Sequence, residues 1–281
     1  MYIDTVKSNF PWILAIICVA VFWYINKREQ TLGNIKQSLK KENVKKGDFL
    51  IIVLLSGIMI CSLLLFQTAS IDLFSVMGIQ GKSPNVQIQG VGQYIIMIFM
   101  MAVFPALVEE LVFRGVVLQG MRKHGAVVAV LVSSLLFSLY HMNAAQTVYQ
   151  FIMGIIYASV VVLTGSLLLT MLLHFINNFI IITYTFIMKP SSGETQLAWG
   201  VDPNFWNPYN VITALVLAYI GLILIWGLVK LLARKSDNRK GGKKDGVDPW
   251  RRSKRFAKID YIGYIVCIAV AVGFWIATIF M

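Results

Sequence analysis

Long apolar stretches alternate with short polar ones along almost the whole chain. A helix needs ~20 mainly apolar residues to cross about 30 Å of hydrocarbon, and the sequence offers about eight such stretches. They predict membrane spans at Phe10–Ile25, Phe49–Ser70, Tyr94–Leu118, Ala126–His141, Thr147–Leu163, Ser166–Met188, Val211–Leu232 and Ile259–Met281. The first stretch lacks a basic start and an A-x-A-type cleavage site, so we expect a retained span and not a signal peptide.

This pattern predicts an all-α fold: a polytopic membrane protein with a single transmembrane domain over residues 1–281 and any site inside the helix bundle. The composition agrees, because 58% of the residues are hydrophobic and only 14% are charged, which an ordinary soluble domain would not tolerate. Cys18, Cys61 and Cys267 fall inside apolar stretches without a CxxC pair. We therefore expect neither a disulfide framework nor a thiolate metal site.

Basic residues account for the net charge of +12 and gather in three loops. These loops lie between the first two predicted spans, at Arg122 and Lys123, and along the run from Lys230 to Lys258. The positive-inside rule places them in the cytoplasm and both termini outside. Such loops suit anionic lipid head groups, so we expect no nucleic-acid partner. The short chain and lysine-rich loops indicate the plasma membrane of a bacterium.

Five ionisable residues fall inside or at the end of predicted spans: Glu109, Glu110, Arg114, His141 and His174. Burying charge in lipid is costly, so such residues usually face a protein interior and mark function. Glu110 and Arg114 are four apart, in the favourable order for an ion pair on one helix face. Glu109 is turned about 100° away from that pair. We therefore predict that Glu109 is the reactive carboxylate.

The spacing allows these groups to converge with Asn178. If the third and fourth spans turn at Lys123–Gly125, Glu109 and His141 both lie ~23–26 Å from the turn and can meet. His174 and Asn178 are four apart and share a helix face. A carboxylate and an imidazole can activate one water, and a second imidazole with a carboxamide can hold an oxyanion. The pattern therefore indicates hydrolysis of a carbonyl compound.

Three short motifs carry a family resemblance. Glu109 to Arg114 reads EELVFR, Phe137 to His141 reads FSLYH, and His174 to Asn178 reads HFINN. In this order they resemble the motifs EExxxR, FxxxH and HxxxN of the CAAX prenyl protease and bacteriocin-processing family of intramembrane glutamic endopeptidases. The motifs cover about a quarter of the chain, and a protease core is expected over residues 94–188.

The resemblance implies that Glu109 with His141 activates the water and that His174 with Asn178 holds the oxyanion. Three further residues would support the site: Glu110, Arg114 and Phe137. The implied substrate is a membrane-associated peptide or a lipidated protein, and no cofactor is expected.

Other functions stay open at this stage. Glu109, His141 and His174 could bind zinc in a zinc-dependent membrane protease, although HExxH is absent. A non-catalytic bacteriocin-immunity or scaffold membrane protein could keep the same fold. A proton-coupled transporter also uses intramembrane charges, but paired interrupted helices are not apparent.

Overall fold

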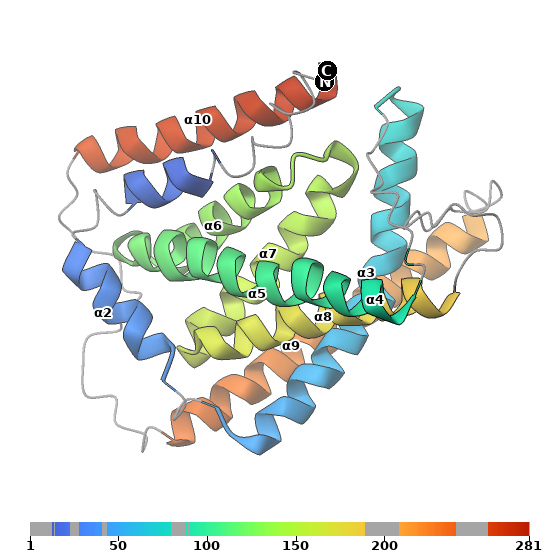
Figure 1. Cartoon of the computed structure of the whole chain (residues 1–281), viewed down its shortest axis with the longest axis horizontal. Coiled ribbons are helices and arrows are strands. Elements are labelled where there is room, and N and C mark those ends of the chain that lie inside the picture. Colours follow the sequence, from blue (N-terminus) through green and yellow to red (C-terminus); the bar gives the residue numbers. More distant parts are fainter. Residues whose placement is uncertain are drawn as a thin grey trace.

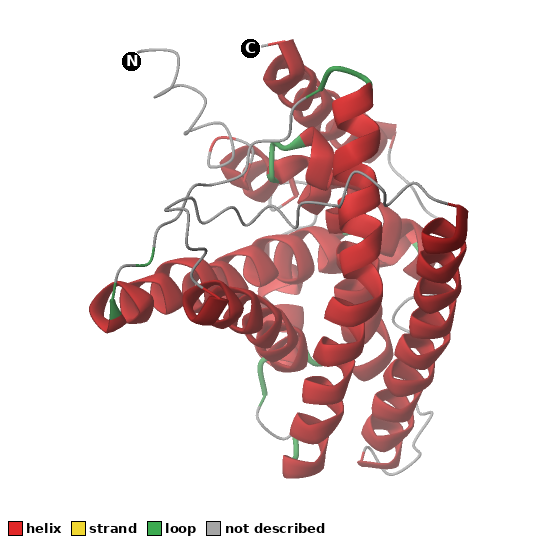
Figure 2. Ribbon diagram, turned by 90° about the vertical axis from the view of Figure 1, so that its right-hand side faces the viewer, coloured by secondary structure: helices red, strands yellow, loops and turns green. Residues whose placement is uncertain are grey.

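The computed structural model describes residues 13, 15–22, 28–40, 44–79, 88, 90–188, 208–239 and 258–280. All regular secondary structure in these ranges is helical, and they contain no strand (Figures 1 and 2). Five of the described helices are long and apolar enough to cross a membrane. The predicted fold class, an all-helical polytopic membrane protein, is confirmed.

The helices follow the predicted spans closely. They are α2 (Arg28–Ser38), α3 (Lys46–Val76), α4 (Val91–Ile98), η2 (Phe99–Val103), α5 (Phe104–Glu109), η3 (Glu110–Leu118), η4 (Arg122–His124), α6 (Ala126–Tyr140), α7 (Ala144–Thr164), α8 (Leu167–Met188), α9 (Pro208–Arg239) and α10 (Lys258–Phe280). The polar helix α2 was not predicted. Of the first predicted span, residues 15–22 are helical and most others lie outside the described residues, as do residues 240–257 of the basic run.

Not every predicted span has spanning length. α6 has 15 residues, and the apolar part of α10, Tyr264–Ala277, is also short. The predicted turn after the third span is confirmed, because η4 leads into Gly125, whose φ of 94° suits glycine. Gly165, with φ 71°, likewise ends α7 in the left-handed region before α8 begins.

Four helices, α3, α7, α8 and α9, pack together in one part of the bundle. α6 packs against α7 on one side and against η3 on another, and α10 packs along α6 (Figure 1). The α6–α7 approach is close because Gly154 lies opposite Ser134: a Cβ placed at Gly154 would be 2.9 Å from the Ser134 Cβ. Both helices also bond to η3: Ser133 of α6 donates to the Phe113 carbonyl, and the Gly154 carbonyl of α7 accepts from Arg114.

The helical segments α4, η2, α5 and η3 form one continuous helix, Val91–Leu118, which we call the composite helix. Its segments η2 and η3 are π-helical, a wider form often found at functional sites. One side carries exposed apolar side chains, among them Phe99, Phe104 and Leu107. The other side packs against α8 and α6, so the composite helix lies at the edge of the bundle with Glu109, Glu110 and Arg114 turned inward.

Candidate active site

The Glu110–Arg114 ion pair lies at the centre of the site. Glu110 begins the π-helical segment η3, and its Oε1 accepts a hydrogen bond from Arg114 Nη1 at 2.9 Å. Both side chains are fully buried. The predicted pair is confirmed. Because buried charges are costly unless they are paired and hydrogen-bonded, the two residues depend on each other.

Helices α6 and α7 enclose the Arg114 guanidinium. Its Nη2 donates to the Gly154 carbonyl at 3.3 Å. The guanidinium carbon lies 4.2 Å from the centroid of the Phe137 ring and 5.2 Å from that of Tyr157. Cation–π contacts of this kind gain strength away from water. Phe137 is therefore in direct contact with Arg114.

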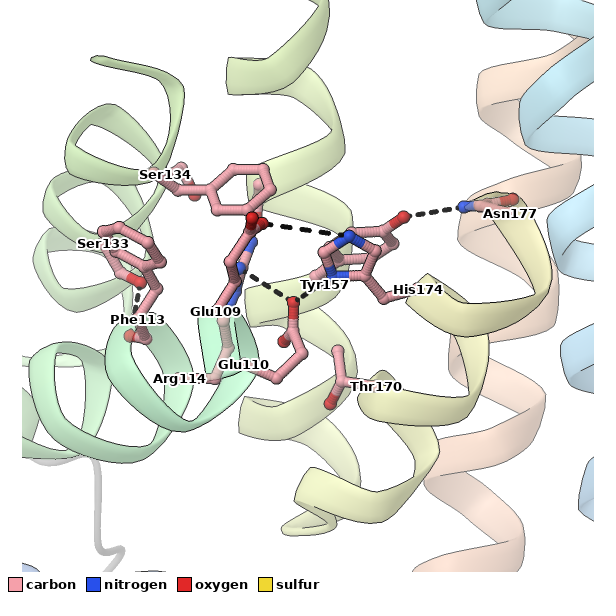
Figure 3. Close-up of polar contacts among 12 residues, drawn as sticks. Glu109, Glu110, Phe113, Arg114, Ser133, Ser134, Tyr157, Thr170, His174 and Asn177 are labelled. Carbon is pink, nitrogen blue, oxygen red and sulfur yellow. Dashed lines mark hydrogen bonds and ion pairs between the residues drawn. The ribbon is translucent and has the colours of Figure 1, made fainter. Parts of the chain in front are cut away.

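His174 lies between the two glutamates (Figure 3). Its Nδ1 is 2.9 Å from Glu110 Oε1, and its Nε2 is 3.9 Å from Glu109 Oε2. A carboxylate only accepts, so Nδ1 carries the proton in this contact. One oxygen of Glu110 thus receives hydrogen bonds from both Arg114 and His174, and the imidazole plane is fixed.

Glu109 has different surroundings from Glu110. Its side chain is 13% exposed, and its Oε2 has no hydrogen-bond partner among the described residues. The 3.9 Å to His174 Nε2 exceeds direct hydrogen-bond distance, and polar groups farther apart than 3.5 Å are often bridged by water. Glu110 Oε2 also lacks a partner among the described residues, so the two carboxylates differ in that Glu109 is partly exposed and Glu110 is fully buried.

His141 follows the last residue of α6. Its Nδ1 is 2.9 Å from the Phe137 carbonyl oxygen, so this nitrogen donates and Nε2 is left for another contact. Its ring meets the Phe137 ring edge-on at 4.8 Å, and Phe137 in turn meets His174 at 6.0 Å. His141 and Glu109 interact electrostatically. Among the described contacts, His141 reaches the cluster through Phe137 and not by a direct bond to Glu109.

Asn178 contacts the composite helix at another point. Its Nδ2 donates to the Met101 carbonyl at 3.0 Å. In an α-helix that carbonyl would accept from the N–H of residue 105, but proline has none. Met101 lies in the π-helical segment η2, and Asn178 supplies its carbonyl with a donor from another helix. Its amide has a second hydrogen that this bond does not use.

Comparison with known proteins shows a similarity to one family over part of the chain. Residues 91–180 match the family model described as Type II CAAX prenyl endopeptidase Rce1-like. This part of the chain is similar to that family. The match runs from α4 into α8 and contains all three motifs, which confirms the resemblance found in the sequence. No curated protein and no solved structure matches the chain.

The Rce1-like family is a family of proteases, which supports a hydrolase. Within the described part of the chain, no three His, Cys, Asp or Glu side chains are arranged to hold a metal ion. Glu109, His141 and His174, which a zinc ion would need as ligands, do not form such a group.

Three residues that received no role from the sequence, Tyr157, Asn177 and Ser56, form a hydrogen-bonded chain beside His174. Tyr157 of α7 stacks on the His174 ring at 5.1 Å with an interplanar angle of 27°. Asn177 Nδ2 donates to the Tyr157 hydroxyl at 2.8 Å, and Ser56 of α3 donates to Asn177 Oδ1. This chain of hydrogen bonds fixes the ring on which His174 lies (Figure 3). A tyrosine in an apolar run gives no sequence signal that separates it from core packing.

Proposed function

We propose that this protein is an intramembrane endopeptidase that hydrolyses a peptide bond in a membrane-associated peptide or a lipidated protein. The observation that carries the proposal is the Glu109 carboxylate, which is partly exposed and has an oxygen without a hydrogen-bond partner among the described residues. It lies beside His174, in a segment that matches a protease family.

In the proposed reaction, Glu109 removes a proton from a water molecule while His141 helps to orient that water. The hydroxide attacks the carbonyl carbon of the peptide bond. The resulting oxyanion accepts hydrogen bonds from His174, in its doubly protonated form, and from the second amide hydrogen of Asn178. When the C–N bond breaks, Glu109 returns the proton to the leaving amine.

Glu110 and Arg114 support this reaction without taking part in bond making. Glu110 holds His174 Nδ1, so that Nε2 faces Glu109. Arg114 balances the charge of Glu110 in a region that water does not reach. The reactive carboxylate and the structural carboxylate are thereby kept apart, although they are neighbours in the sequence.

The surroundings of the site favour a substrate that lies in the membrane. The composite helix has an apolar, exposed side that would face lipid, so a peptide anchored in the bilayer can approach it closely. The bacterial plasma membrane, the outward termini and the binding of anionic lipids by the basic loops stay predictions from the sequence.

The test is cleavage of a panel of tagged membrane-associated peptides, with and without a prenyl group, in proteoliposomes. Wild type, Glu109→Ala and His141→Ala are compared with and without a strong chelator. We expect product from wild type only, and the same amount with chelator. Chelator-sensitive product would favour a zinc protease instead. If both variants cleave as wild type does, the assignment of the catalytic residues is wrong.

A further inference from the structure

Helix α10 lies outside residues 91–180, and the proposed reaction gives it no task. It nevertheless packs along α6 and contacts residues that lie just beyond both ends of α6. Near its start, Tyr264 meets the His124 ring edge-on at 5.2 Å, just before α6 begins. Near its end, Trp275 bonds to Thr147, just beyond the turn that follows α6. α10 therefore runs along α6 (Figure 1) and reaches the start of α7, just after the turn that carries His141.

That turn has an unusual backbone. Met142, directly after His141, has φ 47°, in the left-handed region that few residues other than glycine adopt. A residue keeps such a conformation only where its surroundings hold it. The position of the His141 ring depends on this turn. The His141 backbone N–H donates to the Ser138 carbonyl, which holds the beginning of the turn against the end of α6.

Three side-chain hydrogen bonds hold the turn. Ser138 Oγ donates to the Thr147 carbonyl at 2.5 Å, which ties the end of α6 to the start of α7. Thr147 Oγ1 donates to the Asn143 carbonyl at 2.9 Å. Trp275 Nε1 donates to Thr147 Oγ1 at 2.7 Å.

The roles in this chain of hydrogen bonds are fixed by the groups themselves. An indole N–H can only donate, and the Thr147 hydroxyl has one hydrogen, which it gives to Asn143. Trp275 therefore binds the lone pair of a hydroxyl that is already donating, and bonds in such a chain strengthen one another. The indole thus fixes the orientation of the Thr147 hydroxyl, which donates to the Asn143 carbonyl in the turn.

We propose that Trp275 is a positioning residue for His141 and that α10 holds the turn 141–143 in its catalytic geometry. The proposal rests on the proposed function, in which His141 orients the water. It assigns a task to a helix outside the Rce1-like segment. Trp275 acts through Thr147 and the turn, and does not touch the substrate.

The kinetic test uses two matched pairs of variants. Trp275→Phe keeps an aromatic ring but removes the N–H, and Trp226→Phe makes the same change at an exposed site on α9. Thr147→Val removes the hydroxyl, and Thr147→Ser keeps it. We expect kcat to fall about 10-fold to 100-fold in Trp275→Phe and Thr147→Val, with KM within about twofold of wild type. Trp226→Phe and Thr147→Ser should retain the wild-type kcat.

A second readout does not depend on activity. The chain has three histidines, so the ring signals of isotope-labelled histidine can be assigned by single His→Gln variants. We expect Trp275→Phe and Thr147→Val to shift or broaden the His141 signals, and Trp226→Phe to leave them unchanged. If the His141 signals respond but no peptide is cleaved, the positioning is supported and the proposed function fails.

The opposite result would overturn the positioning proposal. Unchanged His141 signals and an unchanged kcat in both Trp275→Phe and Thr147→Val would show that α10 does not set the turn. Equal losses in Thr147→Ser and Thr147→Val would also count against it, because the serine hydroxyl keeps the bond. Melting curves identify any variant that fails to fold. If Trp275→Phe does not fold, the comparison of Thr147→Ser with Thr147→Val tests the positioning proposal.

Discussion

Glu109 and Glu110 are neighbours in the sequence but differ in what they bind. Glu110 Oε1 accepts hydrogen bonds from Arg114 and His174, and its side chain is fully buried. Glu109 is partly exposed, and its Oε2 has no hydrogen-bond partner among the described residues. Residue spacing could predict this division, because Arg114 is four residues after Glu110 on one helix face.

Loss of the Arg114 charge should destabilise the protein strongly. Arg114→Met leaves Glu110 as a buried charge without its cation, which typically costs about 3–5 kcal/mol. The measurement is thermal unfolding in detergent, followed by circular dichroism. The double variant Glu110→Gln with Arg114→Met should recover part of the loss. Equal melting temperatures for wild type and Arg114→Met would contradict the account of this pair.

Removing the Tyr157 hydroxyl should lower stability more than activity. Tyr157→Phe keeps the ring that stacks on His174 but leaves the buried Asn177 amide without its acceptor, a loss of about 1–3 kcal/mol. The matched control, Tyr219→Phe, changes an exposed side chain and should stay within about 0.5 kcal/mol of wild type. Unfolding curves and kcat are measured on both. A larger effect from Tyr219→Phe would argue against the hydrogen-bond chain.

At the scale of elements, the composite helix shows why some features could not be predicted. The apolar pattern predicts a helix over Tyr94–Leu118, and the segments α4 to η3 confirm it. The prediction used the α-helical period of 3.6 residues over the whole length, which the π-helical segments do not follow. The π-helical segments η2 and η3 depend on contacts with α8 and α6, which the local sequence does not contain. Pro105 is a sequence signal for an irregular helix. The hydrogen bond from Asn178 to the Met101 carbonyl, however, is a tertiary contact that the local sequence does not predict.

The close approach of α6 and α7 makes Gly154 a sensitive position. In Gly154→Ala the new methyl group would lie 2.9 Å from Ser134 Cβ and 3.0 Å from its Cα, so the helices must separate. Such overpacking costs about 1–3 kcal/mol, which outweighs the gain in helix propensity of ~1 kcal/mol. We expect a lower melting temperature and, because Arg114 bonds to the Gly154 carbonyl, a lower kcat.

Gly227→Ala on α9 is the control for this prediction, because a Cβ there would meet nothing within 4 Å. It should be neutral, or more stable by up to about 1 kcal/mol. If both alanine variants melt at the same temperature, the α6–α7 contact is not as tight as described.

At the scale of the whole molecule, the sequence predicted the class of protein and the segment that carries the site. Apolar runs determine which segments can lie in lipid, so the second to eighth predicted spans each overlap described helices. The contact of α10 with the His141 turn was not predictable, since Trp275 and Thr147 are far apart in the sequence. Packing between distant segments decides such contacts, and an apolar pattern does not encode the partner of each helix face.

In the proposed reaction, Glu109 activates water to hydrolyse a peptide bond. The most direct measurement is mass spectrometry of a membrane-anchored peptide after incubation in ¹⁸O-labelled water with wild type, Glu109→Gln and the control Glu29→Gln in proteoliposomes. We predict one ¹⁸O in the new carboxylate of the product from wild type and Glu29→Gln, and a rate at least about 100-fold lower for Glu109→Gln. Cleavage by Glu109→Gln at the wild-type rate would contradict the claim.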